Sequence, residues 1–401
     1  MEDWKEYKLG DCVEAVIDNR GKSAPTKPLG EFPLLEINSI GGYYPNYSVI
    51  RKYVDKVTYN TWFRSGHPIC GDILIPTVGT IGIISIMDNH KACIAQNLIA
   101  LRTKKDISNI FIYYFLKSPI VKKQLINLDI GGVQPSIKVP HLLNLSISLP
   151  EKDIQHKIAS ILSSLDDKIE VNRKINENLE QQAQALFKSW FVDFEPFKDQ
   201  PFVESELGMI PQGWRVENLS SIADYINGLA MQKFRPVDGE RGLPVLKIKE
   251  LGQGSVDNNS ELCSPSLIGE KYIIDDGDII FSWSGTLMVK VWCGGKCGLN
   301  QHLFVVIPKD NPKWFVYQWT NYHLDNFIRI AKDKAVTMGH IKRGELDKAM
   351  VVVPDEVNMQ RIDDLMTPIF EQIISLKKES RRLAELRDTL LPRLMSGEIL
   401  L

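Results

Sequence analysis

The chain has 401 residues, of which 44% are hydrophobic, which is enough for two globular domains with cores of their own. Pro, Thr and Gly interrupt its apolar runs well short of the roughly 20 residues that a membrane helix needs. Because the acidic N-terminus is also unlike a secretory signal, we expect a cytoplasmic protein with no membrane partner. The net charge of −2 argues against nucleic-acid binding by bulk electrostatics alone.

Residues 1–150 predict a mixed α/β domain. Short β-branched runs at 32–38 and 81–87 are cut by Gly and Pro, and one helix is expected near Ser108–Leu128. Pro119 should interrupt that helix because proline lacks the backbone donor that a helix interior needs.

Residues 151–203 have helical periodicity and almost no glycine. A heptad stripe runs through Ile158, Leu165, Asn172, Leu179 and Leu186. A single buried Asn in such a stripe can fix the register of a coiled coil, so Asn172 is the candidate register residue. The excess of acid lies here, with 7 basic and 11 acidic side chains in residues 151–205.

Residues 204–354 repeat the first domain. The segment GDILIPTVGTIG begins at Gly71 and GDIIFSWSGTLM begins at Gly277, and further matches continue towards residue 354. Two copies of this length indicate a duplicated domain. The repeated Gly-Thr pairs, Gly79-Thr80 and Gly285-Thr286, are better explained by a shared backbone turn than by a choice of ligand.

Residues 355–401 carry a second heptad stripe through Ile362, Ile369, Leu376, Leu383 and Leu390. Pro368 is expected to divide this segment, so that the regular helix begins near it. Two such segments, each after a copy of one domain, predict that the helices pair, and an antiparallel pair would relate the domains by a pseudo-twofold axis.

The predicted fold class is therefore α+β, with two similar mixed α/β domains separated by two long antiparallel coiled-coil helices. The predicted domains are residues 1–150, a central helical spacer 151–203, a second domain 204–354, and a C-terminal helical spacer 355–401.

Catalytic signatures are missing from the sequence: there is no phosphate-binding loop, dinucleotide fingerprint, nucleophile elbow, HExxH pair or methyltransferase motif. The nearest approaches to a metal site are Cys263, Cys293, Cys297 and His302 for zinc, and Glu345, Asp347 and Lys348 for a nuclease. We interpret the six cysteines as free thiols and the three charged residues as a solvated face.

Three segments and the duplicated GDI…GT blocks carry a resemblance to a known family. Residues 205–214 (SELGMIPQGW) resemble the start of the second target-recognition domain in the DNA-specificity subunits of type I restriction-modification enzymes. Residues 186–196 (LFKSWFVDFEP) look like the end of that family's central conserved helix, and residues 387–399 (RDTLLPRLMSGEI) look like its C-terminal signature. The resemblance spans nearly the whole chain.

The resemblance implies a non-catalytic subunit. Each target-recognition domain would read one half of a split, asymmetric site in double-stranded DNA, and the helices would set the gap. Two modification subunits, carrying S-adenosylmethionine for adenine methylation, would dock on the helices, and two restriction subunits would add translocation and cleavage with ATP and Mg. No cofactor is expected in this chain.

Candidate DNA-binding residues are polar, basic and aromatic side chains in Gly/Pro-rich loops, since such side chains can hydrogen-bond to base edges. In the first domain they are Arg20, Lys22, Lys27, Tyr43, Tyr44, Thr77, Thr80, Gln96, Asn97, Gln134, Ser136 and Lys138. In the second they are Gln232, Lys233, Arg235, Lys247, Ser282, Trp283, Thr286, Asn300, Gln301, His302, His340 and Lys342.

The residues alone leave other hypotheses open. The duplicated architecture would also fit a self-contained DNA-binding regulator, or a scaffold whose long helices are the working surface. A fused methyltransferase or nuclease is disfavoured by the length and by the missing motifs.

Overall fold

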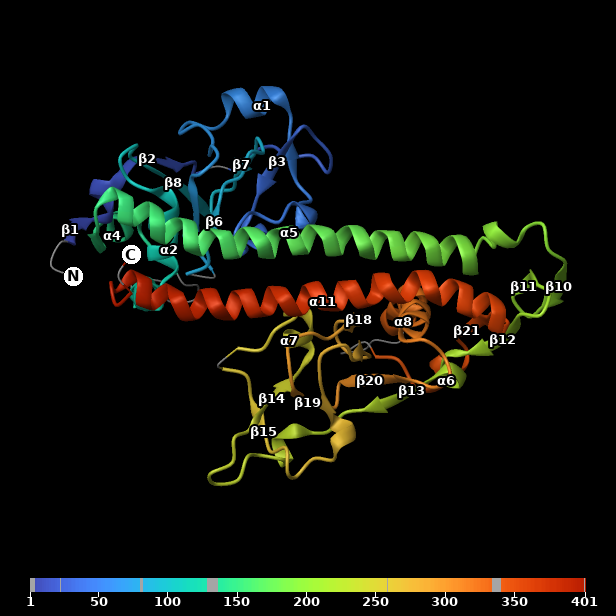
Figure 1. The fold of residues 1–401 in the computed structure, drawn as a ribbon. Helices are drawn as coiled ribbons and strands as arrows, with labels where there is room; N and C mark the ends of the chain where they lie inside the picture. Colours follow the sequence, from blue (N-terminus) through green and yellow to red (C-terminus); the bar gives the residue numbers. More distant parts are fainter. Residues whose placement is uncertain are drawn as a thin grey trace. The chain divides into compact units, whose positions relative to one another are not determined.

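The computed structural model describes residues 4–21, 23–79, 82–127, 136–257, 259–333, 340–399 and 401. The chain forms two compact units (Figure 1). Unit 1 consists of residues 1–170 and 383–401, and unit 2 consists of residues 171–382. Each unit therefore contains one of the predicted repeats together with part of both predicted helical segments.

Unit 1 contains a four-stranded sheet, a three-stranded sheet and a two-stranded pair (Figure 1). Its strands are β1 (Lys5–Lys8), β2 (Val13–Asp18), β3 (Phe32–Leu35), β4 (Tyr53–Val54), β5 (Ile73–Pro76), β6 (Ser85–Ile86), β7 (Cys93–Ile94), β8 (Leu98–Thr103) and β9 (Ser146–Leu149). Its helices are α1 (Lys56–Thr61), α2 (Asn109–Lys117), α3 (Pro119–Asn127) and α4 (Val139–Leu143), with parts of α5 (Lys152–Phe191) and α11 (Glu356–Met395). The break between α2 and α3 at Ser118 confirms the predicted interruption at Pro119.

Unit 2 is built from a larger set of elements. Its strands are β10 (Phe202–Ser205), β11 (Gly208–Pro211), β12 (Arg215–Asn218), β13 (Ala223–Asn227), β14 (Leu243–Leu246), β15 (Leu262–Cys263), β16 (Ile273–Ile274), β17 (Ile279–Ser282), β18 (Met288–Val291), β19 (Cys297–Leu299), β20 (Leu303–Pro308) and β21 (Met350–Val353). Its helices are α6 (Leu219–Ile222), α7 (Ile248–Gln253), α8 (Lys313–Tyr322), α9 (Leu324–Asp333) and α10 (Gly344–Asp347), with the remaining parts of α5 and α11.

The two repeats share one topology. The order of the main sheet is β2-β8-β5-β6 in unit 1 and β13-β20-β17-β18 in unit 2. In each repeat a second sheet joins a parallel pair, β3 with β7 or β14 with β19, to an antiparallel neighbour, β4 or β15. The first strand pairs with the last, β1 with β9 and β12 with β21. The predicted duplication is therefore confirmed by strand order and pairing.

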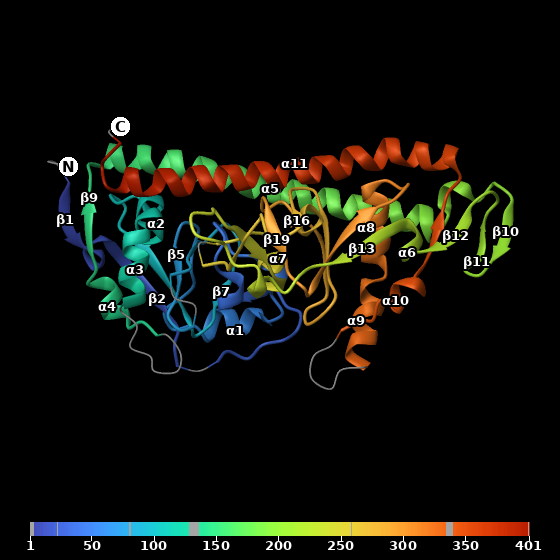
Figure 2. The ribbon, with the colours of Figure 1, turned by 90° about the horizontal axis from the view of Figure 1, so that it is seen from below.

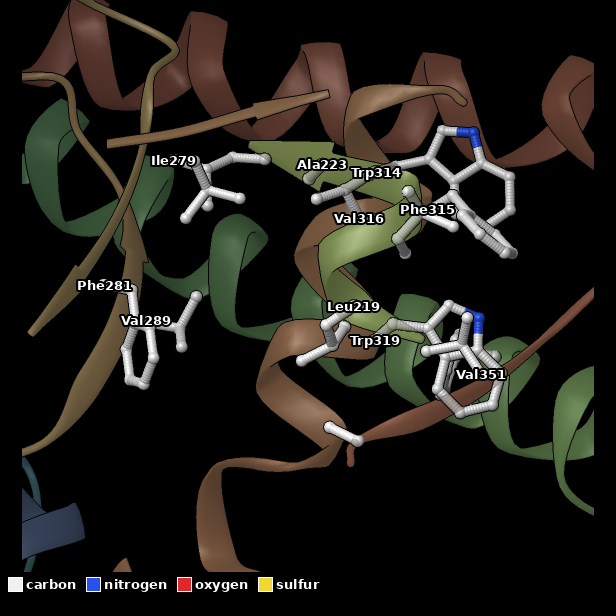
Figure 3. Packing of buried hydrophobic residues seen from close by; sticks show 14 of the residues in the cluster. Leu219, Ala223, Ile279, Phe281, Val289, Trp314, Phe315, Val316, Trp319 and Val351 are labelled. Carbon is white, nitrogen blue, oxygen red and sulfur yellow. The ribbon is translucent and has the colours of Figure 1, made fainter. Parts of the chain in front are cut away.

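The inner strands β5 and β17 are buried on both faces, which explains their mainly apolar sequences. The largest core, in unit 2, packs β17 and β18 against α8 and the C-terminal part of α5 (Figure 3). Trp314, Phe315 and Trp319 of α8 are at most 2% exposed and contribute large rings to this core. The ring centroid of Phe191 of α5 lies 6.1, 5.5 and 6.1 Å from those of Trp314, Phe315 and Trp319.

The helices α5 and α11 pair within each unit, and Figures 1 and 2 both draw them side by side. In unit 1 Ile158 and Leu162 of α5 share a core with Leu391 and Leu394 of α11. In unit 2 the later residues Phe187 and Phe191 share a core with the earlier residues Ile362 and Met366. Early residues of α5 thus pack against late residues of α11, and late residues of α5 pack against early residues of α11. This order confirms the predicted antiparallel pairing.

The prediction that Pro368 divides the second helical segment is wrong. Helix α11 runs unbroken from Glu356 to Met395. A proline inside a helix costs about 3 kcal/mol, but Ile362, Met366, Phe370 and Ile373 on either side of it are at most 7% exposed. Burial of this apolar face, at roughly 1.5–3 kcal/mol for each large side chain, outweighs the cost.

Candidate nucleic-acid interface

A glycine in the left-handed region follows β5 in unit 1 and β17 in unit 2. Gly79 and Gly285 have φ values of +85° and +65°, which favour glycine. Ser282 donates a hydrogen bond of 2.8 Å from Oγ to the carbonyl of Thr286, which closes the turn in unit 2. These features support a backbone role for both glycines and for Thr286.

Two further segments meet this turn. The N–H of Ile137 donates to the carbonyl of Thr77 at 2.9 Å, and the N–H of Ile341 donates to that of Trp283 at 3.2 Å. In unit 1 the N–H of Thr77 also donates to the carbonyl of Asn97 at 2.9 Å. The segments before β8 and after residue 135 thus converge on the turn of the first repeat.

The second repeat shows the same convergence through side chains. Ser284 Oγ lies 3.0 Å from His302 Nδ1, and an isolated bridge joins Ser284 to His340. Trp283 donates from its indole N–H to Asn227 Oδ1 at 2.9 Å. Its ring centroid lies 6.2 Å from that of His302 and 6.3 Å from that of His340. A half-buried indole among imidazoles offers both flat faces and hydrogen-bonding edges, as recognition of a base requires.

The first repeat has a cleft at the corresponding place. Gln96 and Asn97 line a cavity of about 200 Å³ together with Glu36, Lys52 and Trp62. The cavity wall therefore combines amide, carboxylate, ammonium and aromatic groups. This mixture can distinguish hydrogen-bond donors from acceptors on a ligand edge.

Most of the predicted DNA-binding residues are accessible. Those with exposed side chains are Arg20, Lys27, Gln96, Lys138, Gln232, Lys233, Arg235, Thr286, His340 and Lys342. Those that are partly buried are Tyr44, Asn97, Ser136, Lys247, Trp283, Gln301 and His302. Arg20 is paired with Asp18, and Lys27 with Asp55 at 3.1 Å, so both cations already have an intramolecular partner. Lys22, Thr80 and Gln134 lie outside the described residues.

Four predicted residues are buried, and we remove them from the candidate interface. Tyr43 is 8% exposed and packs against Tyr113 at 5.5 Å between ring centroids. Thr77 is 2% exposed, with Oγ1 3.3 Å from the carbonyl of Asn97. Ser282 is fully buried in its turn, and Asn300, 7% exposed, accepts from the N–H of His302 at 3.2 Å. In each case the group that was expected to contact a base is buried or already makes a hydrogen bond within the protein.

Sequence reasoning missed several charged and polar residues beside these turns, namely Glu36, Lys52, Asn227 and Glu261. A signal for Glu36 was present. The segment FPLLEIN at 32–38 matches LPVLKIK at 243–249, and it places Glu36 and Lys247 at the same position. The offset differs from that of the GDI blocks because the intervening loops differ in length.

Asn172, the candidate register residue, is fully buried within unit 2. Its Nδ2 donates to Glu379 Oε2 at 2.6 Å and to Ser380 Oγ at 3.3 Å, so it links α5 to α11. Lys377 adds a second link to Glu180 at 2.8 Å. These contacts support a role in register, which stays a prediction.

The cysteines considered as zinc ligands are buried in the hydrophobic cores. Cys263, Cys293 and Cys297 belong to three different core clusters, and all six cysteines are free thiols. Within the described residues, no group of three or more His, Cys, Asp and Glu side chains is arranged to hold a metal ion. In the same part of the chain, no helix is long and apolar enough to cross a membrane.

Comparisons with known proteins agree with one another. The family described as the type I restriction modification DNA specificity domain matches residues 1–181 and 211–386. The MjaIX specificity subunit of Methanocaldococcus jannaschii is 26% identical over 99% of this chain and 94% of its own length. The HindI specificity subunit of Haemophilus influenzae is 27% identical over 67% of this chain and 72% of its own length.

A solved structure shares the fold. The S subunit of a type I restriction-modification system from M. genitalium aligns with a TM-score of 0.54 and 17% identity, over 98% of this chain and 96% of that one. Together with the duplicated sheets and paired helices, the family match identifies the chain. It belongs to the type I restriction modification DNA specificity family and is a non-catalytic specificity subunit.

Proposed function

We propose that each repeat reads one half of a bipartite, asymmetric site in double-stranded DNA. The observation that carries this proposal is one backbone frame with different side chains at equivalent positions. Asn97 before β8 corresponds to His302 before β20, and Ser136, which bridges to Val78, corresponds to His340, which bridges to Ser284. Identical frames with different hydrogen-bonding groups suit two readers of different sequences.

The helices α5 and α11 would set the gap between the half-sites, with the repeats related by a pseudo-twofold axis. Each has 40 residues, which corresponds to about 60 Å of helix at 1.5 Å per residue. The buried contacts of Asn172 and the ion pair between Lys377 and Glu180 favour one register. A fixed register is what a molecular ruler requires.

Catalysis would belong to partners. Two modification subunits would dock on the helices and methylate adenine with S-adenosylmethionine, and two restriction subunits would supply translocation and cleavage with ATP and Mg. The near-neutral net charge of −2 supports this division. Partners would have to supply much of the positive surface that neutralises DNA phosphates.

The test is co-expression with a modification subunit of a type I restriction-modification system from the same organism, followed by sequencing of methylated adenines. We expect a stable complex and methylation at a split site with a constant gap. A regulator would instead bind a short continuous site tightly without partners. A scaffold would not bind DNA, and so would lack the affinity for DNA that falls steeply as the salt concentration rises.

The ruler is tested by removing one heptad, residues 173–179, from α5 together with residues 372–378 from α11. Seven residues shorten a helix by about 10 Å, which is the length of about three base pairs. We expect a library of split sites to show a preference for a correspondingly shorter gap. An unchanged gap would contradict the ruler.

A further inference from the structure

An ion pair occurs at the same place in both repeats, with its charges reversed. Glu36 directly follows β3 and pairs with Lys52, which directly precedes β4. Lys247 directly follows β14 and pairs with Glu261, which directly precedes β15. Because β3 pairs with β4 as β14 pairs with β15, the two positions are structurally equivalent.

Neighbouring contacts confirm the equivalence. Ile37 follows Glu36, and its Cδ1 lies 3.7 Å from where a Cβ on Gly79 would stand. Ile248 follows Lys247, and its Cδ1 lies 3.5 Å from the corresponding point on Gly285. In both repeats, therefore, the residue after the charged one packs against the glycine of the turn.

The pairs are short and remain accessible. Lys52 Nζ lies 2.7 Å from Glu36 Oε1, with side chains 51% and 36% exposed. Lys247 Nζ lies 2.5 Å from Glu261 Oε2, with side chains 44% and 16% exposed. Arg235 adds a second cation 2.8 Å from Glu261 Oε1. The hydrogen bond from Lys247 lowers the pKa of Glu261, which keeps that carboxylate charged.

Stability alone does not account for the reversal. An exposed ion pair contributes little to the free energy of unfolding, and it does so equally in either orientation. What the reversal changes is the group displayed after β3 or β14: an acceptor in the first repeat and a donor in the second. In unit 1 that group lines the cleft shared with Gln96, Asn97 and Trp62.

We propose that Glu36 and Lys247 are equivalent base-reading residues, and that Lys52 and Glu261 position them. This inference rests on the proposed function. The carboxylate of Glu36 accepts from an exocyclic amino group, as on cytosine N4, and the ammonium of Lys247 donates to guanine O6 or N7. Each keeps capacity after pairing, since a carboxylate has about four lone-pair sites and an ammonium has three donors.

The test exchanges the charges while keeping the attraction. In the complex with the modification subunit, Glu36→Lys with Lys52→Glu should change one position of the first half-site, from cytosine towards guanine. We expect the preference at that position to shift at least about tenfold, with the second half-site and the gap unchanged. Lys247→Glu with Glu261→Lys should act on the second half-site alone.

The matched control is Arg215→Glu with Glu217→Arg, which reverses a pair at 2.5 Å whose side chains are 59% and 25% exposed on β12. This control should methylate the wild-type site. Unchanged preference at every position in both exchange variants would overturn the proposal.

An exchange variant that methylates nothing is replaced by Glu36→Gln or Lys247→Gln, checked for unfolding temperature and complex assembly. Relaxed preference at one position then supports the proposal, and unaltered preference overturns it. Failure of the proposed function is a separate result, because the wild-type complex itself would then leave no split methylated site.

Discussion

Removal of Asp166 should destabilise unit 1 more than its small size suggests. Its side chain is 3% exposed and accepts from Tyr114 Oη at 2.6 Å and from the guanidinium of Arg387. Lys117 Nζ lies 3.9 Å away. This cluster joins α2, α5 and α11. Breaking a buried ion pair by removing one partner costs about 3–5 kcal/mol, because the remaining charge is left without compensation.

We therefore expect Asp166→Leu to lower the free energy of unfolding of unit 1 by about 3–5 kcal/mol. Arg387→Met should cost less, because Tyr114 and Lys117 still serve the carboxylate. The double variant should recover much of the loss, since a buried pair replaced by apolar groups is often neutral. The thermodynamic cycle would thus show a coupling of at least about 2 kcal/mol.

The assay is urea unfolding followed by circular dichroism, with amide exchange in residues 152–170 and 383–395 to place the loss in unit 1. The control is Lys198→Ala, because its pair with Glu195 is exposed at 59% and 53% and should matter by less than about 1 kcal/mol. Additive losses in the double variant, or a loss below about 1 kcal/mol for Asp166→Leu, would refute the reasoning.

Other variants test the protonation of Lys117, the core of unit 2 and the register of α5 against α11. Burial lowers the pKa of Lys117 from 10.5 to about 8, so between these values the unfolded chain binds the proton that the folded chain has released. Stability should rise with pH across that window, and Lys117→Met should abolish the rise in urea midpoints. Phe191→Ala should lower the free energy of unfolding of unit 2 by about 3–5 kcal/mol in the same assay. Val357→Ala should have a negligible effect, because Val357 is 79% exposed at the start of α11. Asn172→Leu should produce two exchanging populations in amide exchange of residues 171–191, whereas Asn178→Leu, on the exposed face, should not.

The sequence predicts the duplicated fold well because the turns impose local requirements. Gly71 and Gly277 adopt φ values of +90° and +92°, and such positions keep glycine visible in both copies. The two helices were also predictable, since a stripe of apolar residues must face a partner. The continuity of α11 through Pro368 was not predictable, because only tertiary contacts reveal that packing outweighs the cost of a proline.

The candidate interface was less predictable for a different reason. A loop composition rich in Gly and Pro identifies a turn but not the direction of each side chain. Tyr43 therefore points into the core while its neighbour Tyr44 remains partly accessible. Glu36 and Glu261 escaped notice because each lies at a strand end, where its partner comes from the neighbouring strand, 16 and 14 residues away in the sequence.

The composition of unit 1 from two distant stretches has a consequence for synthesis. Leu391 and Leu394 of α11 are 3% and 2% exposed and fill the same core as Leu9 and Phe111. The ribosome makes those leucines nearly 400 residues after the first strand. Until α11 has been synthesised, the core of unit 1 therefore lacks these two side chains and exposes apolar surface. A frameshift late in the reading frame would leave that surface exposed permanently.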